Sequence, residues 1–289
     1  RIAQARKSAN LYPGDLRLIA QKSGSSWRLY PIVHVYMEDY LCGVVPYEMG
    51  NSAHVEALKA QAVAARTYTL NKMNQRASSL YDVVDTTNDQ VYYGNSDSTA
   101  NCTTAVLATK GIVLMNGSSL TSTWYTASNG GQTESALNCW GSTGYSYLTV
   151  KDDPFDLMNA ASSVKSATVY AEYASAAQPS ALKALLEAKV RDAVGSAVIQ
   201  RIEAITPHTP KFSAPSRLYT KMDFDLTVSV SGTARRVTVT CDIFSELESA
   251  LGLSINAAKN ELWSVSGSGS TFTIQARRYG HGVGMSQRG

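Results

Sequence analysis

The feature that most constrains this chain is an alanine-rich stretch, "EALKAQAVAARTYTL", which predicts a helix over residues 53–74. Five alanines between positions 57 and 65 let neighbouring elements approach this helix closely. Helical periodicity places Lys59 and Arg66 on the same face as Val55 and Ala62. Because a surface helix carries its cations opposite its apolar face, we predict a central helix whose two cations point into the protein. The alternative is that both cations snorkel or pair with structural carboxylates.

The segment before this helix predicts a strand and then a short helix. Residues 27–37 are rich in β-branched and aromatic types, as strands are. "EDYLCGVV" predicts a helix that ends at Pro46, because proline lacks the backbone N–H that a helix needs. Asn51 and Ser52 are the expected caps of the next helix. Glu48 therefore falls at a bend between two helices, with apolar residues beside it.

The rest of the chain alternates helical and strand patterns. The expected elements are a strand followed by polar turns over 81–95, a helix over 102–110, hairpins around Asn116-Gly117 and over 224–243, helices over 179–195 and 244–252, and a strand ending near 279. This mixture indicates an α+β fold with helices and antiparallel hairpins around a cleft. We predict a core over 1–158, a variable helix-hairpin-helix segment over 159–270, and a strand with a glycine-rich loop over 271–289 that returns to the core.

Composition excludes several classes of protein. The formal net charge is only +3 and no dense Lys/Arg run occurs, so we expect no nucleic-acid partner. No stretch of about 18 apolar residues is present, so no segment of this sequence is expected to span a membrane. There is no signal-peptide pattern, and both ends look like cut points in a longer precursor. We therefore expect any anchor to precede this sequence.

The four cysteines carry little information. Cys42, Cys102, Cys139 and Cys241 are far apart and lack the paired spacing of a zinc site. We expect no metal and no cofactor. Two disulfides and four thiols both fit this spacing, and mostly free thiols are the favoured alternative. A cysteine nucleophile at Cys42 or Cys139 is a minor possibility, and no serine stands in a GxSxG elbow.

Glu48 is the first candidate for chemistry. A carboxyl group held in apolar surroundings resists ionisation and can serve as a general acid near neutral pH. The alternative is a surface glutamate at the start of a helix, where the helix dipole favours its charge.

A second group of candidates lies near the ends of strands. His281 stands among three glycines in "GHGVG", which bring backbone close to a neighbouring group. It is a candidate hydrogen-bonding or titrating residue. Tyr125, Ser128 and Asn129 lie in "WYTASNGGQTE", and such donors suit a sugar, which presents many hydroxyl groups. An ordinary polar loop is the alternative.

Together these motifs resemble the SpoIID family, the group of stage II sporulation protein D and amidase enhancers. The matching stretches are "EDYLCGVVPYEMGNSAHVEALKAQAVAARTYTL", "DTTNDQVYYG", "TSTWYTASNGGQTESALNCWGSTGYSYLTVKDDPFD" and "GHGVGMSQRG", in the expected order. Residues 33–156 match closely, and residues 160–270 match only in kind. The resemblance implies a peptidoglycan lytic transglycosylase that cuts between N-acetylmuramic acid and N-acetylglucosamine, preferring strands without stem peptides, and leaves a 1,6-anhydro end.

The resemblance also implies roles for individual residues and partners. Glu48 carries over as the catalytic glutamate of the "VVPYEM" motif. The substrate-binding residues that it implies are Lys59, Arg66, Tyr125, Ser128, Asn129, His281 and Gln287. The expected partners are glycan strands, a cell-wall amidase and a membrane-anchored engulfment complex. The expected location is extracytoplasmic, at the cell wall, with a membrane anchor N-terminal to this sequence.

A lytic transglycosylase explains why one carboxylate is enough. Most glycosidases use two, one as acid and one to activate water or attack the sugar. Here the C6 hydroxyl of muramic acid attacks the anomeric carbon instead. Glu48 would protonate the leaving oxygen and then accept the proton from that hydroxyl.

Three positions depart from the family pattern. Asn129 stands where the family has a serine, Gln132 where an aromatic residue is common, and Arg288 where an aromatic often follows the glutamine. These changes put substrate preference in question more than Glu48. Two rival interpretations stay open: a non-catalytic glycan-binding enhancer of an amidase, and an interaction domain that docks through residues 160–250.

Overall fold

Contacts divide the chain into two units, and the boundary between them in the sequence falls between Trp124 and Tyr125. The computed structural model describes residues 11–95, 100–267 and 269–289. Residues 1–10, where the sequence suggested a cut point, lie outside the described residues. Both units combine helices with antiparallel strands, which confirms the predicted α+β class.

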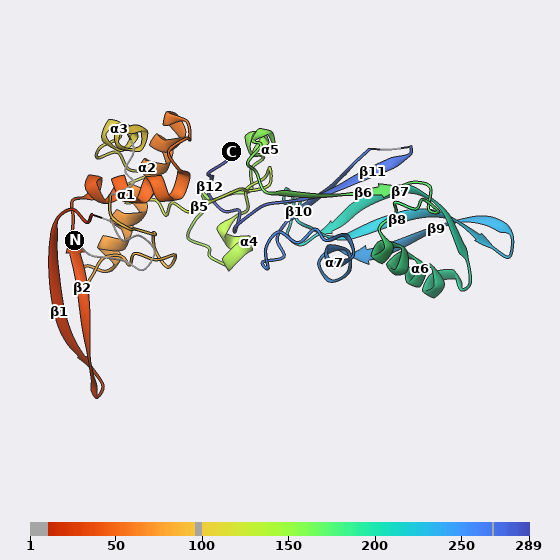
Figure 1. Cartoon of the computed structure of the whole chain (residues 1–289), viewed down its shortest axis with the longest axis horizontal. Coiled ribbons are helices and arrows are strands. Elements are labelled where there is room, and N and C mark those ends of the chain that lie inside the picture. The colour runs from red at the N-terminus through yellow and green to blue at the C-terminus, as the bar shows by residue number, and fades with distance from the viewer. Residues whose placement is uncertain (1–10, 96–99, 268) are drawn as a thin grey trace. The chain divides into compact units, whose positions relative to one another are not determined.

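The first unit packs three helices around one apolar core (Figure 1). Its elements are β1 (Asp15–Ser23), β2 (Ser26–His34), α1 (Met37–Met49), α2 (Val55–Gln75), α3 (Ala100–Ala108), β3 (Met115–Asn116) and β4 (Ser119–Leu120). The core is formed by fully buried side chains from α1, α2 and α3, among them Leu41, Leu58 and Val106. β1 and β2 form a separate two-stranded sheet.

Several predictions for this unit are confirmed. The helix over 53–74 corresponds to α2, the helix over 102–110 to α3, and the hairpin at Asn116 to the short pair β3–β4. Their boundaries shift by a few residues. The predicted strand over 27–37 is β2, and its partner β1 was not foreseen.

Three predictions for this unit are wrong. α1 continues through Pro46, which gives up its own backbone hydrogen bond, to Met49, and Gly50 ends it by donating its N–H to the Pro46 carbonyl. The N-cap of α2 is His54, whose Nδ1 accepts the N–H of Glu56, rather than Asn51 or Ser52.

The third correction concerns the strand predicted at the start of residues 81–95: the structure has no strand there, and the whole segment is irregular, with turns. The buried carboxylate of Asp89 accepts hydrogen bonds from the backbone of Val84 and from Arg76 and Tyr68 of the α2 region. Side chains therefore satisfy this backbone where a neighbouring strand would otherwise do so.

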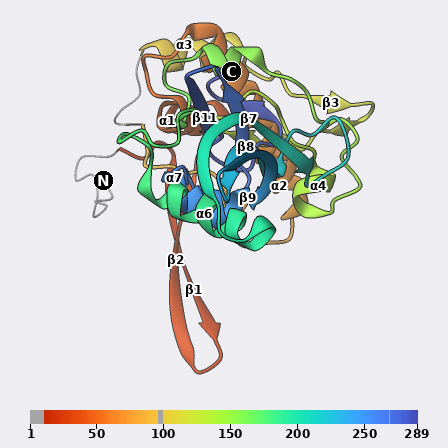
Figure 2. The same cartoon turned by 90° about the vertical axis from the view of Figure 1, so that its right-hand side faces the viewer.

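The second unit surrounds a larger core between sheets and a helix. Its elements are β5 (Tyr125–Thr126), α4 (Ala136–Trp140), α5 (Pro154–Met158), β6 (Val164–Tyr170), α6 (Ser180–Val194), β7 (Val198–Pro210), β8 (Tyr219–Val230), β9 (Thr233–Asp242), the π-helical turn η1 (Ile243–Leu247), α7 (Glu248–Leu251), β10 (Leu262–Ser266), β11 (Thr271–Arg277) and β12 (Met285–Ser286). β7, β8 and β9 form one sheet, and β10, β11 and β6 form another. α6 lies along the first of these sheets (Figure 2) and buries Leu182, Leu186 and Val190.

The predictions made from regular sequence patterns in this unit are confirmed. The helix over 179–195 is α6, the hairpin over 224–243 is β8–β9 with its turn at Ser231-Gly232, and the helix ended by Gly252 is η1 with α7. β6, however, occupies part of the segment 159–180 that suggested a boundary.

The unit boundary also differs from the predicted one. The segment after Trp124 pairs with the C-terminal loop: β5 pairs with β12 in parallel, and Ser128 pairs with Tyr279. These backbone hydrogen bonds join the motif-rich residues 125–158 to the second unit. The C-terminal loop thus pairs, through β12, with a strand of its own unit.

Candidate functional site

Glu48 lies in the last turn of α1, in the first unit. The preceding turns of this helix are fully buried at Leu41, Val44 and Val45, which fixes the position of the helix. Gly50 ends the helix with a φ of 69° and donates its N–H to the carbonyl of Pro46 at 3.0 Å. The Glu48 side chain is half-buried at this end. A rigid element thus carries the predicted catalytic carboxylate.

Lys59 lies near the start of α2. Its ammonium group pairs with Glu56 one turn earlier, at 2.7 Å, and its side chain is 33% exposed. Lys59 is therefore on the flank of the helix, whereas the buried side contains Leu58, Ala62 and Ala65. The pairing within one helix leaves Lys59 accessible to solvent.

Arg66 has a different environment, although it shares the helical face of Lys59. Its side chain is 3% exposed and donates hydrogen bonds to both carboxylate oxygens of Glu38. It also donates to the carbonyls of Val106 and Ile112 and to the hydroxyl of Thr109. These bonds tie α2 to α1 and to the end of α3. This geometry favours the alternative that Arg66 braces the fold.

Ser128 and Asn129 lie in the second unit and are fully buried. The hydroxyl of Ser128 donates to one oxygen of Asp156 at 2.8 Å, and the N–H of Asn129 donates to the other at 2.7 Å. The side chain of Asn129 bonds Asp153 and the N–H of Gly131. Both residues thus hold the "SNGG" loop in place.

Asp156 is the centre of this network, and sequence reasoning missed it. Besides Ser128 and Asn129, it accepts bonds from the hydroxyls of Ser162 and Ser286. It lies at the start of α5 and is fully buried. In the "DDPFD" motif, Asp153 followed by Pro154 is a pattern that indicates the start of a helix. The pattern does not indicate which residues bond to Asp156.

Tyr125 and Gln287 lie on the pair of strands that closes the same loop. Tyr125 is directly opposite Met285 in the β5–β12 ladder, and the N–H of Gln287 donates to the carbonyl of Thr126 at 2.9 Å. Both side chains are half-buried. The structure therefore brings together five of the predicted residues, Tyr125, Ser128, Asn129, His281 and Gln287, around one loop system of the second unit.

His281 follows β11 and is held in one tautomer. Its Nδ1 accepts the N–H of Val283 at 3.0 Å, and its ring also bonds the backbone of Tyr125. Burial, together with the nearby Arg278 guanidinium, lowers the pKa of His281 below its usual value, while the bond to Tyr125 opposes that shift. The imidazole is therefore neutral near pH 7.

Arg278 is a fully buried guanidinium behind this loop. It donates to the backbone carbonyls of Asn129, Asn260 and Gln132 at 3.0, 3.1 and 2.9 Å. Burial lowers the pKa of Arg278, and the charge of Glu134 opposes that effect. Its backbone φ of 116° is rare for a residue other than glycine. The side chain joins the end of β11 to two other segments of the unit, the loop 129–132 and the loop that contains Asn260.

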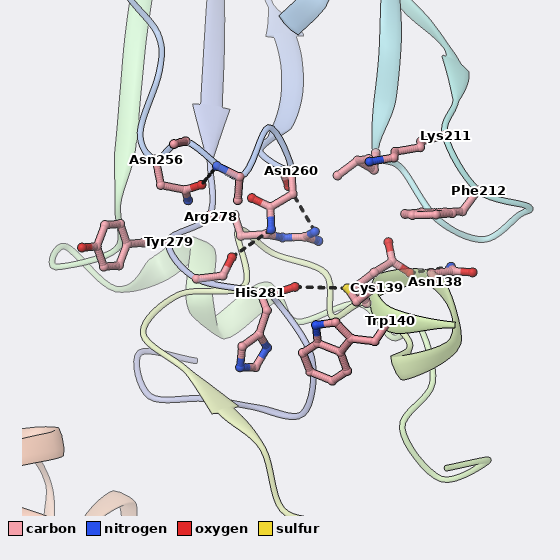
Figure 3. A pocket seen from close by; sticks show the side chains of 15 residues that line it. Asn138, Cys139, Trp140, Lys211, Phe212, Asn256, Asn260, Arg278, Tyr279 and His281 are labelled. Carbon is pink, nitrogen blue, oxygen red and sulfur yellow. Dashed lines mark hydrogen bonds between the residues drawn. The ribbon is translucent and has the colours of Figure 1, made fainter. Parts of the chain in front are cut away.

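Arg278 and Asn260 also line an open cavity of about 600 Å³ within the second unit (Figure 3). Trp140 and His281 contact each other edge to face on one wall, with ring centroids 5.1 Å apart. Lys211 and Phe212, from the loop after β7, line another part. Tyr279 also lines the cavity, and 49% of its surface is exposed to solvent. Among these residues, only His281 was a predicted site residue: Trp140 lies in a matching motif but was not singled out, and Lys211 and Phe212 lie outside the quoted motifs.

The two alternative nucleophiles lose support here. All four cysteines are free thiols, in line with the favoured alternative. Burial raises the pKa of the Cys42 thiol and raises that of Cys139 to about 11. Both therefore stay protonated near neutral pH, and a thiol is a poor nucleophile compared with a thiolate.

Two of the departures from the family pattern have structural roles. The side chain of Gln132 is buried and bonds Asp152, the carbonyl of Pro215 and the N–H of Arg217. Arg288 donates to the hydroxyl of Ser163 at 2.9 Å. These residues join neighbouring loops of the second unit.

Comparison with known proteins gives concordant matches. A family model described as stage II sporulation protein (SpoIID) matches residues 26–116. An amidase enhancer of Bacillus subtilis (strain 168) is 32% identical over 271 residues, covering 86% of this chain and 36% of that protein. A stage II sporulation protein D of the same organism is 29% identical over 278 residues, covering 89% of this chain and 68% of that protein. This chain belongs to the SpoIID family.

The SpoIID match divides the candidate residues. Glu48, Lys59 and Arg66 lie inside the segment matched by the family model, and the other five lie beyond it. The longer pairwise matches extend over most of the chain. This SpoIID chain spans about a third of the length of the amidase enhancer that it resembles. Across the described parts of the chain, no helix has both the length and the apolar character needed to cross a bilayer.

Proposed function

We propose that this SpoIID chain is a peptidoglycan lytic transglycosylase that uses Glu48 as its single acid and base. The observation that carries the proposal is the position of Glu48. It lies inside the segment matched by the SpoIID model and at the end of a helix whose preceding turns are fully buried. A catalytic group must be held in one place by its support, and α1 supplies that support.

The geometry of α1 favours a mechanism with one carboxylate. The other acidic residues of this helix, Glu38 and Asp39, lie in its first turn. Ten residues of helix separate Glu38 from Glu48, which is roughly 15 Å. That exceeds the separation of about 5 to 9.5 Å found between paired carboxylates in glycosidases. Glu38 is in addition bound to Arg66. α1 thus offers Glu48 alone.

In the proposed reaction, Glu48 donates its proton to the glycosidic oxygen as the bond from that oxygen to C1 of the muramic acid breaks. The C6 hydroxyl of the same sugar then forms a bond to C1, and its proton passes to the Glu48 carboxylate. The enzyme returns to its starting state, and no water is consumed. The products are a new N-acetylglucosamine end and a 1,6-anhydro end.

The structure suggests different roles for the remaining candidates. Lys59 is accessible and suits the lactyl carboxylate of muramic acid. Tyr125 and His281 are half-buried, and their proposed role is to form hydrogen bonds with glycan at the second unit. Arg66, Ser128 and Asn129 direct their polar groups to protein partners, so we assign them to holding helices and loops in place.

The names of the relatives suggest where this reaction takes place. One relative is a stage II sporulation protein and another an amidase enhancer. We propose a role in remodelling the cell wall, outside the cytoplasm, during sporulation. The proposed substrate is a glycan strand without stem peptides. A cell-wall amidase and a membrane-anchored engulfment complex are the proposed partners.

A second function has one observation in its favour. The relative that matches 86% of this chain is called an amidase enhancer, a name that describes an effect on another enzyme. Under this alternative, the chain binds glycan without cutting it. Glu48 is then one polar group among several.

The test is mass spectrometry of purified glycan strands, with and without stem peptides, after incubation with the wild type and with Glu48→Gln. A general acid contributes about 10²- to 10⁴-fold, so the variant should lose at least 100-fold in the yield of 1,6-anhydromuramic acid. Glu172→Gln, at an exposed glutamate of the second unit, is the matched control and should retain activity.

Two other outcomes would reject the proposal. Products with ordinary reducing ends would mean that water attacks, so a second carboxylate must take part. Absence of cleavage by the wild type, with glycan binding equal in wild type and Glu48→Gln, would favour the enhancer alternative.

A further inference from the structure

The β1–β2 hairpin extends from the helices of the first unit (Figures 1 and 2). Nine residues of each strand pair in register, from Asp15 opposite His34 to Ser23 opposite Ser26. Among the described residues, no third strand pairs with either one. A two-stranded sheet is marginally stable in water by itself, so an extended hairpin of this length needs an explanation.

One face of this hairpin is apolar and open to solvent. Residues directly opposite each other in an antiparallel pair share a face, and the face alternates along each strand. Leu18 is opposite Pro31, and Ala20 is opposite Leu29, which places all four on one face with Leu16 and Trp27. The large side chains of this set are 50% to 69% exposed: Leu16, Leu18, Leu29 and Trp27. We call this set the apolar face.

The opposite face turns toward the protein. Tyr30 lies on it and stacks on Tyr81 with ring centroids 6.5 Å apart. Ile19, which pairs with Tyr30, is partly buried as well. The hairpin is therefore anchored through one face, and this contact leaves the apolar face directed away from its own unit.

The charges of the hairpin have one sign. Between Leu16 and His34 there are three cations, Arg17, Lys22 and Arg28, and no acidic residue. Lys22 is opposite Trp27 and so shares the apolar face near the tip. Arg17 and Arg28 are on the other face, with long side chains that can reach past the edges of the strands. The one carboxylate of the two strands, Asp15, is at the base.

This pattern decides between possible partners. Two copies meeting through this face would bring together two hairpins that both carry cations, and like charges repel. The face is also about 30 Å long and two strands wide, less than a stable protein interface requires. An apolar surface bordered by cations, with tryptophan near one end, is instead the composition that binds an anionic lipid surface.

We propose that the β1–β2 hairpin lies on an anionic lipid bilayer through its apolar face, with Lys22 contacting lipid phosphates and with Arg17 and Arg28 adding positive charge to the hairpin. The polar tip, Ser23 to Ser26, argues for a hairpin that lies along the surface over one that inserts end-on. This binding is separate from the proposed reaction at Glu48. It would keep the first unit at a membrane surface.

The test is co-sedimentation of the intact chain with vesicles of phosphatidylcholine alone and of phosphatidylcholine mixed with phosphatidylglycerol. We expect binding to the anionic vesicles only, weakening as salt is added. Replacing Lys22 by Gln should weaken binding about fivefold, and Trp27→Ser at least tenfold. Matched controls are Lys165→Gln and Phe155→Ser, which alter an exposed lysine and an exposed aromatic residue of the second unit.

Vesicle binding is measured independently of glycan cleavage. Cleavage of soluble glycan strands and the thermal unfolding temperature should be the same in the hairpin variants as in the wild type. Absence of binding to either vesicle would overturn the proposal and leave the apolar face to a protein partner. Binding that the control variants weaken as much as the hairpin variants would also overturn it.

Discussion

The guanidinium of Arg66 binds both carboxylate oxygens of Glu38, with Nε–Oε1 at 3.1 Å and Nη2–Oε2 at 2.6 Å. The pair joins the middle of α2 to the first turn of α1, whose last turn carries Glu48. A residue that seemed from its helical position to face a substrate thus positions the helix of the proposed acid.

Arg66→Lys should therefore lower the free energy of unfolding by about 2 kcal/mol, because a lysine keeps the charge but loses the two-point bond and the contacts to carbonyls. The unfolding transition of the first unit in urea measures this loss of free energy. Lys59→Gln is the matched control, and should cost less than about 0.5 kcal/mol because its ion pair is on the surface. If Arg66→Lys kept full stability but lost glycan affinity, the substrate-binding role would be right.

Gly282 packs against the buried guanidinium of Arg278. A Cβ at this position would lie 2.9 Å from Cζ of Arg278, and the backbone φ is +77°. Gly282→Ala should thus lower the free energy of unfolding by about 2 to 3 kcal/mol, the sum of backbone strain and a steric contact. Gly141→Ala is the control, because φ is +68° there and the space is open. It should cost only about 1 kcal/mol, and equal losses would show that Arg278 yields to the methyl group.

His281 should make stability depend on pH. Its pKa is lowered in the folded state, so the unfolded chain takes up a proton first as pH falls. The stabilisation is complete above about pH 6.5 and declines as pH falls from there toward the lower pKa of the folded state. Urea unfolding of the wild type and of His281→Gln between about pH 7.5 and pH 5 tests this. The difference between the two proteins should shrink as the pH falls, and a constant difference would contradict the shift.

The sequence predicted elements well where one pattern decides the local structure. The strict alternation over 224–243 and the amphipathic helix over 179–195 each depend on residues near one another, and both are present as β8–β9 and α6. The prediction failed where a distant partner decides. Residues 81–95 are irregular because Asp89 meets Arg76, and β1 exists only because it pairs with β2.

The candidate site shows the same limit. Position in a motif identified Ser128 and Asn129, but not that Asp156 would accept their bonds, since that depends on how α5 packs. The face shared by Lys59 and Arg66 follows from helical geometry alone. Their different environments follow from Glu38, which only the folded unit brings to Arg66. Glu48 remains the residue that the motif and the position on α1 favour together.

The parallel pairing of Tyr125 with Met285 has a consequence for how the chain folds during synthesis. The three-helix core of the first unit is complete once α3 has left the ribosome, so this part can fold early. The second unit begins with β5 but cannot close until β12 emerges at the far end of its sequence. Its loops must therefore wait in an open state, and we expect the second unit to fold late and slowly.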